Sequence, residues 1–199
     1  MATTSSSTKA KMIAGATYLI SRRGVHATSL REVVQRTGTP RGSLAHHFPG
    51  GKQQMLEEAI AFASDSVASP LEALLQDKGV ADGLYAFVGW WRRVLESSGF
   101  EAGCPVLAIA IEPLTDDGAA DGAERLRGLA HEAFDRWQAI LFAALQREGV
   151  SVSRARRLST LTVASIEGTV ALCRAGRSSQ PLDDVLSELD TLLKAAVAA

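Results

Sequence analysis

The feature that most constrains the fold is a pair of short helices between residues 28 and 48, whose ends are marked by capping and helix-breaking residues. Ser29 and Glu32 stand three residues apart, which is the spacing of a capping box at a helix N-terminus. Gly38 ends this helix, because glycine readily adopts the left-handed conformation that closes a helix. Pro40 favours the first turn of a new helix, which we expect to run to the end of this range. Two short helices joined by a tight turn are typical of a helix-turn-helix unit.

Longer helices are predicted on both sides of this unit. Apolar residues recur at three- and four-residue intervals over residues 9–23, and Gly24 ends that amphipathic helix. After a proline-glycine break, a further helical periodicity extends from Lys52 towards Pro70. Residues 1–8 are rich in Ser and Thr and have no hydrophobic signal-peptide core, so we expect a flexible tail there.

The net charge of −1 hides two opposed halves of the chain. Residues 1–52 carry eight Lys and Arg against a single Glu, a formal charge of +7, whereas residues 53–199 carry −8. This asymmetry indicates a head that binds a polyanion and a body that avoids nucleic acid. A solvated basic face without a partner is the alternative that charge alone leaves open.

Cysteine content and hydropathy indicate the compartment in which the protein works. Cys104 and Cys173 are too few for a disulfide framework, which favours a reducing environment. The longest apolar run is too short to cross a bilayer, so we expect no membrane association. These observations predict a cytoplasmic protein.

The second short helix carries residue types that read DNA. Arg41 can form a bidentate pair with guanine, and Ser43 can bond either a base or a phosphate. Lys52 can reach the adjacent strand as a point charge. The complete set of predicted DNA contacts is Thr28, Thr39, Pro40, Arg41, Gly42, Ser43, Ala45, His46, His47 and Lys52.

The head of the chain resembles the TetR family of transcriptional repressors over about residues 9–60. The most specific part is residues 28–56, which read TSLREVVQRTGTPRGSLAHHFPGGKQQML. Phe48 and Lys52 match the family pattern, whereas Ala45 stands where the family often has a Tyr that touches DNA. An Ala methyl group can still meet a thymine methyl group, so we keep Ala45 as a candidate contact.

Two further departures from the common family pattern point to a branch of it. The linker FPGGK is one residue longer than the usual spacing, and GCP follows at Gly103–Pro105. Both features resemble the LmrA/YxaF-type branch. Pro40 stands where a Ser or a similar residue is common in the family.

The resemblance implies an all-α fold with two domains. A three-helix DNA-binding domain with a helix-turn-helix is expected at residues 9–52, and a helical ligand-binding and dimerisation domain at residues 53–199, with 53–70 as the connecting helix. It also implies a homodimeric repressor that binds an inverted-repeat operator in double-stranded DNA and is released by a small apolar or aromatic effector.

The remaining sequence reads as helices with short loops. The expected helices span residues 82–98, 105–114, 121–148, 153–174 and 182–198. In the family the last two pair across a two-fold axis, and their apolar stripes permit this here. Completion of the monomer core is the alternative. The predicted dimerisation residues are Leu158, Leu161, Thr162, Ser165, Thr169, Val185, Leu189 and Leu192.

Aromatic residues gather in two parts of the body, and a mostly apolar effector pocket is expected there. Ordinary core packing is the alternative for each aromatic residue. Glu112 and Glu167 sit among apolar neighbours and could orient a cationic or hydroxyl-bearing ligand, unless they are exposed or paired. The predicted ligand-binding residues are Phe62, Phe87, Trp90, Trp91, Cys104, Ile109, Glu112, Phe134, Trp137 and Glu167.

Motifs for catalysis or metal binding are lacking in the sequence. His46 and His47 are adjacent, so they point apart on a helix and do not have the spacing of metal ligands. We therefore expect no enzyme activity, no cofactor and no metal site. The alternative function is a helical small-molecule-binding or small catalytic protein whose helix-turn-helix head is vestigial.

Overall fold

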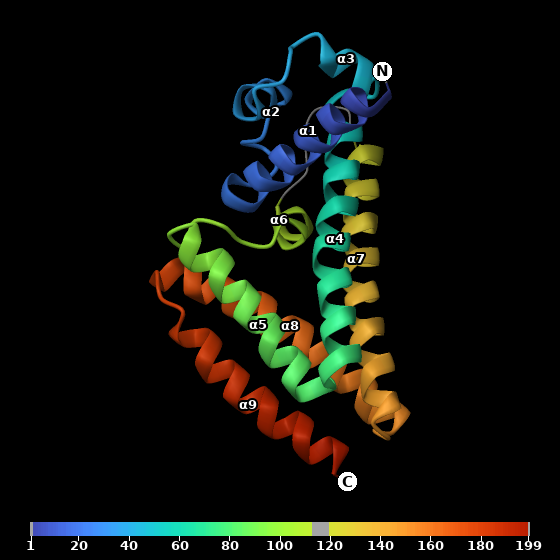
Figure 1. Cartoon of the computed structure of the whole chain (residues 1–199), viewed down its shortest axis with the longest axis vertical. Helices are drawn as coiled ribbons and strands as arrows, with labels where there is room; N and C mark the ends of the chain where they lie inside the picture. The colour runs from blue at the N-terminus through green and yellow to red at the C-terminus, as the bar shows by residue number, and fades with distance from the viewer. Residues whose placement is uncertain (1, 113–119, 199) are drawn as a thin grey trace. The chain divides into compact units, whose positions relative to one another are not determined.

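The computed structural model describes residues 2–112 and 120–198, and in these ranges all regular structure is helical (Figure 1). The prediction of an all-α fold is therefore confirmed. The helices are α1 (Ala2–Arg23), α2 (Leu30–Thr37), α3 (Ser43–His47), α4 (Gly51–Lys78), α5 (Val80–Ser97), α6 (Pro105–Ile111), α7 (Ala120–Arg147), α8 (Val152–Gly176) and α9 (Gln180–Val197). The predicted end of α6 at Leu114 lies outside the described residues.

The chain packs into two compact units. The head unit comprises Met1–Asp65 and Cys104–Ala133, and the body unit comprises Ser66–Gly103 and Phe134–Ala199. Helices α4 and α7 contribute residues to both units. The sequence-based division at residue 52 differs from this packing, because α6 and the first half of α7 belong to the head unit.

Helix α1 begins earlier than the sequence suggests. We expected a flexible tail over residues 1–8, but the helix extends back to Ala2. This stretch contains no Gly or Pro that would stop a helix, so the amphipathic helix continues through it. Met12, Ala16 and Ile20 form its buried face.

The predicted capping box starts α2. The Ser29 hydroxyl accepts a hydrogen bond from the backbone N–H of Glu32 at 3.2 Å, and Glu32 Oε2 accepts one from the backbone N–H of Ser29 at 3.0 Å. Gly38 follows the helix with φ of 63°, in the left-handed region. The start and end of this helix are therefore confirmed.

Helix α3 is shorter than expected. It begins at Ser43 and not at Pro40, because the residues between them form a turn in which the Ser43 N–H donates to the Pro40 carbonyl at 3.0 Å. The helix ends at His47, and Phe48 N–H donates back to the Leu44 carbonyl at 2.7 Å.

Helix α4 continues through Pro70, where we expected it to end. Proline removes one backbone hydrogen bond from a helix interior. Val67, Leu71 and Leu75 are nevertheless buried on one face of the helix, and the apolar burial offsets that loss.

The body unit is built on α5, α8 and α9, which lie side by side (Figure 1). Their contacts bury leucines that are almost fully inaccessible to solvent, namely Leu84, Leu95, Leu158, Leu182 and Leu193. The predicted bounds of these helices differ from the observed ones by a few residues at each end. Helices α5 and α8 also line the cavity described below.

Candidate nucleic-acid interface and a buried cavity

The helix-turn-helix is positioned by a close approach between α1 and α2. A Cβ atom added to Gly15 would collide with Cγ2 of Thr37, so a larger residue would force the Thr37 side chain or the helices to shift. The Thr37 hydroxyl donates to the Val33 carbonyl at 2.7 Å, which holds the methyl group against α1. Sequence reasoning missed this contact, because a single glycine inside a helix gives no signal of its partner.

The turn between α3 and α4 is closed by Gln54. Its Oε1 accepts a hydrogen bond from Gly50 N–H at 2.9 Å, and its Nε2 donates to the His47 carbonyl at 3.3 Å. Phe48 is buried beneath this turn, with the Lys9 ammonium 5.7 Å from its ring centroid. Gln54 fixes the orientation of α3, and the sequence carried no motif that indicated this role.

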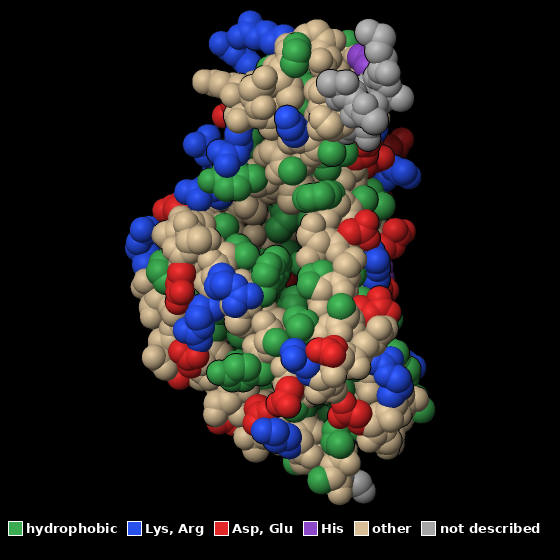
Figure 2. All heavy atoms as spheres, viewed as in Figure 1, with side chains coloured by type: hydrophobic (Ala, Val, Ile, Leu, Met, Phe, Trp, Pro, Cys, Tyr) green, Lys and Arg blue, Asp and Glu red, His purple; other side chains and the backbone are tan. Residues whose placement is uncertain are grey.

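Most of the predicted DNA contacts lie on one accessible surface around α3. Arg41 is exposed, and its side chain forms no ion pair or hydrogen bond with the residues that the structure describes. Lys and Arg side chains dominate this region over acidic ones on the face in Figure 2. We call the following set the recognition surface, whose members are exposed or half-buried: Thr39, Pro40, Arg41, Gly42, Ser43, Ala45, His46, His47 and Lys52.

Thr28 does not share this surface, although the sequence suggested that it contacts DNA. Its side chain is fully buried, and its hydroxyl donates to the Gly24 carbonyl at 2.8 Å. This bond satisfies a carbonyl at the end of α1, where helical partners are lacking. The side chain therefore supports the turn before α2 and has no free path to a phosphate.

Glu112 binds the turn between α1 and α2, where we expected a ligand contact. Its carboxylate accepts hydrogen bonds from the backbone N–H groups of Val25 at 2.6 Å and His26 at 2.8 Å. A Cβ atom at Gly24 would collide with this carboxylate. Glu112 directly follows the last residue of α6, so it attaches α6 to the helix-turn-helix within the head unit.

Three other predicted ligand contacts also lie in the head unit. Cys104 caps α6 by accepting a hydrogen bond from Leu107 N–H at 3.4 Å, and Ile109 is fully buried. Phe62 is exposed on the α4 surface. None of these side chains lines the cavity of the body unit.

Two carboxylates of the head unit have altered acidity. The pKa of Glu32 is lowered mainly by the hydrogen bond from the Ser29 hydroxyl, then by the Ser29 backbone N–H and by nearby Arg23. The pKa of Glu57 is lowered by the Gln53 side chain and then by Arg125, whose Nε lies 2.9 Å from Oε1. In its charged form, Glu32 therefore stabilises α2, and charged Glu57 stabilises α4.

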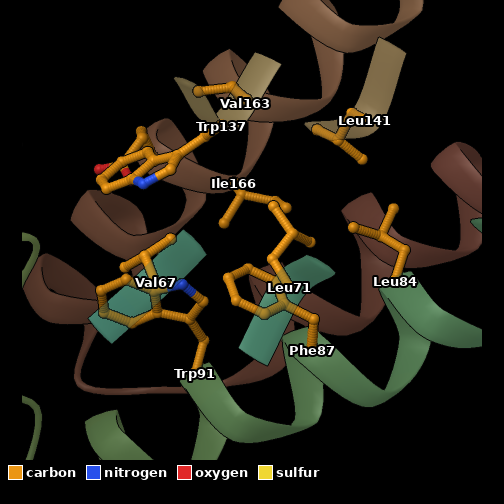
Figure 3. A pocket seen from close by; sticks show the side chains of 10 residues that line it. Val67, Leu71, Leu84, Phe87, Trp91, Trp137, Leu141, Val163 and Ile166 are labelled. Carbon is orange, nitrogen blue, oxygen red and sulfur yellow. The ribbon is translucent and has the colours of Figure 1, made fainter. Parts of the chain in front are cut away.

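The body unit contains a small, partly open cavity of about 20 Å³ between four helices (Figure 3). Helix α4 contributes Val67 and Leu71, and α5 contributes Leu84, Phe87 and Trp91. The Trp91 indole lies on one side of this cavity and Leu84 on the other, as Figure 3 shows.

Helices α7 and α8 supply the remaining walls. Trp137 and Leu141 come from α7, and Val163, Ile166 and Glu167 from α8. Glu167 is 8% exposed, so its carboxylate lies deep in the body unit. Four predicted ligand contacts, Phe87, Trp91, Trp137 and Glu167, thus meet at one cavity. The leucine, valine and isoleucine walls were not singled out in advance, since apolar helix faces look alike in sequence.

The two other aromatic residues predicted to bind a ligand, Trp90 and Phe134, pack against residues that line this cavity. The Trp90 ring centroid lies 5.7 Å from that of Phe87 in a stacked arrangement. The Phe134 ring meets Trp137 edge to face, with 5.3 Å between centroids. These rings support the cavity-lining aromatic residues without lining the cavity themselves.

The proposed dimerisation residues divide into two groups in the structure. Leu158, Thr162, Thr169 and Leu189 are buried within the body unit, so they have no surface to offer a second chain. Leu161 is 44% exposed, and Ser165, Val185 and Leu192 are half-buried. Leu172, which sequence reasoning left out, is 60% exposed on the same helix as Leu161.

A short capped helix, a turn with an exposed arginine and a second short, accessible helix define the class of helix-turn-helix DNA-binding proteins. Comparisons with known families place the chain more closely. Residues 12–59 match the bacterial regulatory proteins of the tetR family, and residues 80–188 match the C-terminal domain of LmrA/YxaF-like transcriptional regulators. The chain belongs to the TetR family of transcriptional regulators, and the resemblance seen in the sequence is confirmed.

Individual relatives agree with this assignment. The chain is 36% identical over 188 residues to an uncharacterised HTH-type transcriptional regulator of Mycobacterium tuberculosis. The aligned region covers 93% of each chain. It is 32% identical to the HTH-type transcriptional regulator LmrA of Bacillus subtilis, over 92% of this chain and 95% of that one. A solved regulatory protein TetR from Rhodobacter sphaeroides shares the fold, with a TM-score of 0.77, 17% identity, and coverage of 92% and 97%.

No helix among the described residues is both long and apolar enough to cross a membrane. The same residues contain no group of three or more side chains that could hold a metal ion.

Proposed function

We propose that this regulator is a homodimeric repressor that binds an inverted-repeat operator in double-stranded DNA and is released by a small effector. The observation that carries the proposal is the exposed Arg41 in the turn just before α3, whose side chain the described residues leave without an ionic partner. An arginine in that position can form a bidentate pair with guanine in the major groove. As a DNA-bound regulator, the protein works in the cytoplasm.

The short recognition helix supports a dimer. Helix α3 has only five residues, so one copy offers few side chains to base edges. Two copies related by a two-fold axis would read half-sites about one helical turn, ~34 Å, apart. We propose that Leu161, Ser165 and Leu172 of α8, with the neighbouring α9 surface, form the contact between copies, since they are accessible apolar or small side chains.

Effector release requires that a ligand bind two conformations with different affinity. We propose that the ligand occupies the cavity of the body unit and displaces the helices that enclose it. Helix α6 follows α5 in the chain, and Glu112 attaches α6 to the turn before α2. A shift of α6 would therefore move the backbone of Val25 and His26, and with it the spacing of the two recognition helices.

The salt dependence of DNA binding tests the proposal. Each phosphate contact should contribute a slope of about −0.9 to the plot of log binding constant against log salt concentration. Arg41→Ala should weaken binding to the selected operator, whereas Arg156→Ala, at an exposed arginine of the body unit, should leave the binding constant and the slope unchanged. Sedimentation of the complex should show two chains on each operator.

A protein whose head does not bind DNA would show no salt-dependent affinity for any duplex. Binding of one chain to a site without repeat symmetry would contradict the dimeric arrangement. Either outcome would leave ligand binding by the body unit as the function to pursue.

A further inference from the structure

The junction between α3 and α4 contains two consecutive glycines, Gly50 and Gly51. Gly51 is the first residue of α4 and has φ of 66°, in the left-handed region. Because glycine leaves the backbone freer than other residues do, this junction restrains the direction of α4 only weakly. Lys52 follows directly, so the position of its ammonium group depends on how side chains hold the first turn of α4.

A first set of contacts fastens this turn to α1. Gln54 Nε2 donates to Glu58 Oε1 at 2.8 Å, and the Lys9 ammonium nitrogen lies 2.7 Å from the same oxygen. Gln54 also donates to the His47 carbonyl at 3.3 Å. The Glu58 carboxylate therefore joins α1 to one face of α4.

A second set of contacts repeats this arrangement towards α7, one residue earlier on α4. Gln53 Nε2 donates to Glu57 Oε1 at 3.0 Å, and Arg125 Nε lies 2.9 Å from the same oxygen. Gln53 Nε2 also donates to the Gly122 carbonyl at 3.1 Å, which employs both amide protons. A step of one residue turns a helix by about 100°, so the two sets hold different faces of α4. We call the second set, Gln53, Glu57, Gly122 and Arg125, the α4–α7 clasp.

Gly122 allows the close approach on which the clasp depends. In the head unit, the N-terminal parts of α4 and α7 lie side by side (Figure 1). A Cβ atom added to Gly122 would lie 2.8 Å from Oε1 and 3.1 Å from Cδ of Gln53. The Gln53 amide is the end of a flexible side chain, so it would move away from a larger residue and lose its bond to the α7 backbone.

We propose that the α4–α7 clasp positions the DNA-contacting end of α4, which makes Gln53, Glu57 and Arg125 positioning residues for operator binding. None of the three belongs to the recognition surface. Lys52 directly precedes Gln53 in the first turn of α4, so a displacement of this turn moves the ammonium group away from its phosphate. The inference rests on the proposed function only in taking the recognition surface as the part of the head that binds DNA.

The clasp affects geometry more than folding stability. The Arg125 side chain is 64% exposed, and ion pairs with so much exposure contribute little to the free energy of unfolding. Met55 and Leu56 hold α4 in the core whether or not the clasp forms. A hydrogen bond to a phosphate, however, weakens once its two heavy atoms are more than about 3.2 Å apart. Variants of the clasp should therefore fold normally and bind DNA less tightly.

Gly122→Ala tests the clasp without removing any of its polar groups. Alanine is more favourable than glycine inside a helix, so the urea midpoint of unfolding should be unchanged or higher. The affinity for the operator selected from random duplex DNA should fall roughly three- to tenfold, the equivalent of one lost hydrogen bond, in a fluorescence-anisotropy titration. Gly128→Ala, on the same helix with open space around it, should leave the affinity unchanged.

Glu57→Ala tests the clasp through the sign of its effect. The substitution removes a negative charge from the head, which strengthens binding to a polyanion if Glu57 has no positioning role. The clasp predicts weaker binding, because Gln53 and Arg125 lose their common acceptor. Glu124→Ala removes the same charge from a side chain of α7 that is 78% exposed, and it should not weaken binding.

A double-mutant cycle shows whether the clasp acts through Lys52. In a Lys52→Ala background the phosphate contact is already absent, so Gly122→Ala should have a much smaller effect on operator affinity than in the wild-type protein. Gly122→Ala alone should also reduce the slope of log binding constant against log salt concentration by about 0.9, as the loss of one phosphate contact does. An equal effect of Gly122→Ala in both backgrounds would overturn the inference.

Two other results would also contradict it. These are wild-type affinity in Gly122→Ala, and binding by Glu57→Ala that is at least as tight as binding by Glu124→Ala. If Gly122→Ala does not fold, the sign of the Glu57→Ala effect decides the question. Failure of the proposed function is distinguishable, since the wild-type protein would then bind no duplex, or Arg41→Ala would bind the operator as tightly as the wild-type protein does.

Discussion

The head unit and the body unit are stabilised by different kinds of contact. In the head unit, hydrogen bonds to backbone groups hold the turns. Ser29 and Glu32 cap α2. Gln54 accepts a bond in the turn before α4, and Glu112 accepts bonds from the turn before α2. In the body unit, large apolar side chains fill the space between long helices. Directional bonds fix the orientation of a short helix, whereas apolar packing allows helices to slide.

This difference fits the two tasks that the proposed function assigns to the protein. A recognition helix must hold a fixed geometry against the DNA grooves, and Gln54 and Phe48 provide that geometry for α3. The proposed effector site must change shape when a ligand binds, and the cavity around Trp91 and Trp137 is lined mostly by apolar side chains.

The largest effect on stability should come from truncating the body core. Leu145 is fully buried on α7, so Leu145→Ala should lower the free energy of unfolding by about 2–5 kcal/mol. Tyr85 is 66% exposed on α5, and Tyr85→Ala should change it by less than about 0.5 kcal/mol. Urea denaturation measures both. Equal effects of the two substitutions would contradict the idea that apolar burial holds the body together.

A smaller effect should follow from forcing α1 and α2 apart in the head. Replacing glycine by alanine inside a helix normally stabilises it by about 0.5–1 kcal/mol. Gly15→Ala should instead lower the free energy of unfolding by about 1–3 kcal/mol, because the new methyl group meets Cγ2 of Thr37. Urea denaturation of the purified variant gives the value.

Two controls decide whether that contact is the cause. Gly128 lies on α7 of the same unit with open space around it, so Gly128→Ala should show the ordinary gain. Thr37→Ser removes the colliding methyl group and should restore most of the stability lost in Gly15→Ala. If Gly15→Ala stabilises the protein as Gly128→Ala does, the close approach of α1 and α2 is not a constraint.

The hydrogen bonds that Glu112 accepts from the α1–α2 turn give the next prediction. Glu112→Gln exchanges a charged acceptor for a neutral one and should cost about 1–2 kcal/mol of local stability. Amide hydrogen exchange at Val25 and His26 should quicken accordingly. Glu124→Gln, at an exposed glutamate of α7, should leave both amides unchanged. Unchanged exchange in Glu112→Gln would remove Glu112 from the link between α6 and the helix-turn-helix.

The smallest effect concerns the pH dependence of the head unit. The Ser29 hydroxyl, first among several contacts, lowers the pKa of Glu32 below its ordinary value. The charged carboxylate therefore contributes stability above the ordinary pKa of glutamate, about 4.3, and this contribution is lost as the pH falls through the lowered pKa of the folded state.

An NMR titration of the Glu32 side chain measures this directly. Ser29→Ala removes the largest cause of the shift, so the pKa of Glu32 should rise towards its ordinary value. Ser29→Thr keeps a hydroxyl at the cap and should keep the lowered pKa. An unaltered pKa in Ser29→Ala would show that the capping box does not hold this carboxylate.

The same contrast between units explains what the sequence could predict. Capping boxes, glycine stops and proline starts act over a few residues, so the start of α2 at Ser29 and its end at Gly38 could be read directly. The residues around Arg41 were predicted to contact DNA from the family pattern. The predicted end of α4 at Pro70 was wrong, since the rule that proline stops a helix considers only local sequence. It does not include the stabilisation from the burial of Val67 and Leu71 in the core.

The candidate sites show the same limit. Glu167 was selected because a carboxylate within an apolar run is conspicuous, and it does line the cavity. Glu112 was selected by the same rule, yet its partners are backbone N–H groups of Val25 and His26, which no residue pattern reveals. Contacts between residues far apart in the chain depend on packing, and a single sequence does not encode them in local spacing.

The most direct test of the account is a selection of random duplex DNA on the purified protein, repeated with Arg41→Ala and Lys52→Ala. We predict enrichment of an inverted repeat with half-sites about one helical turn apart. Arg41→Ala should relax the sequence preference at one base pair of each half-site, at a cost of about 1–3 kcal/mol. Lys52→Ala should weaken binding to all sequences alike. Failure to enrich any sequence, or the same enriched sequence bound with the same affinity by Arg41→Ala, would contradict DNA recognition by α3.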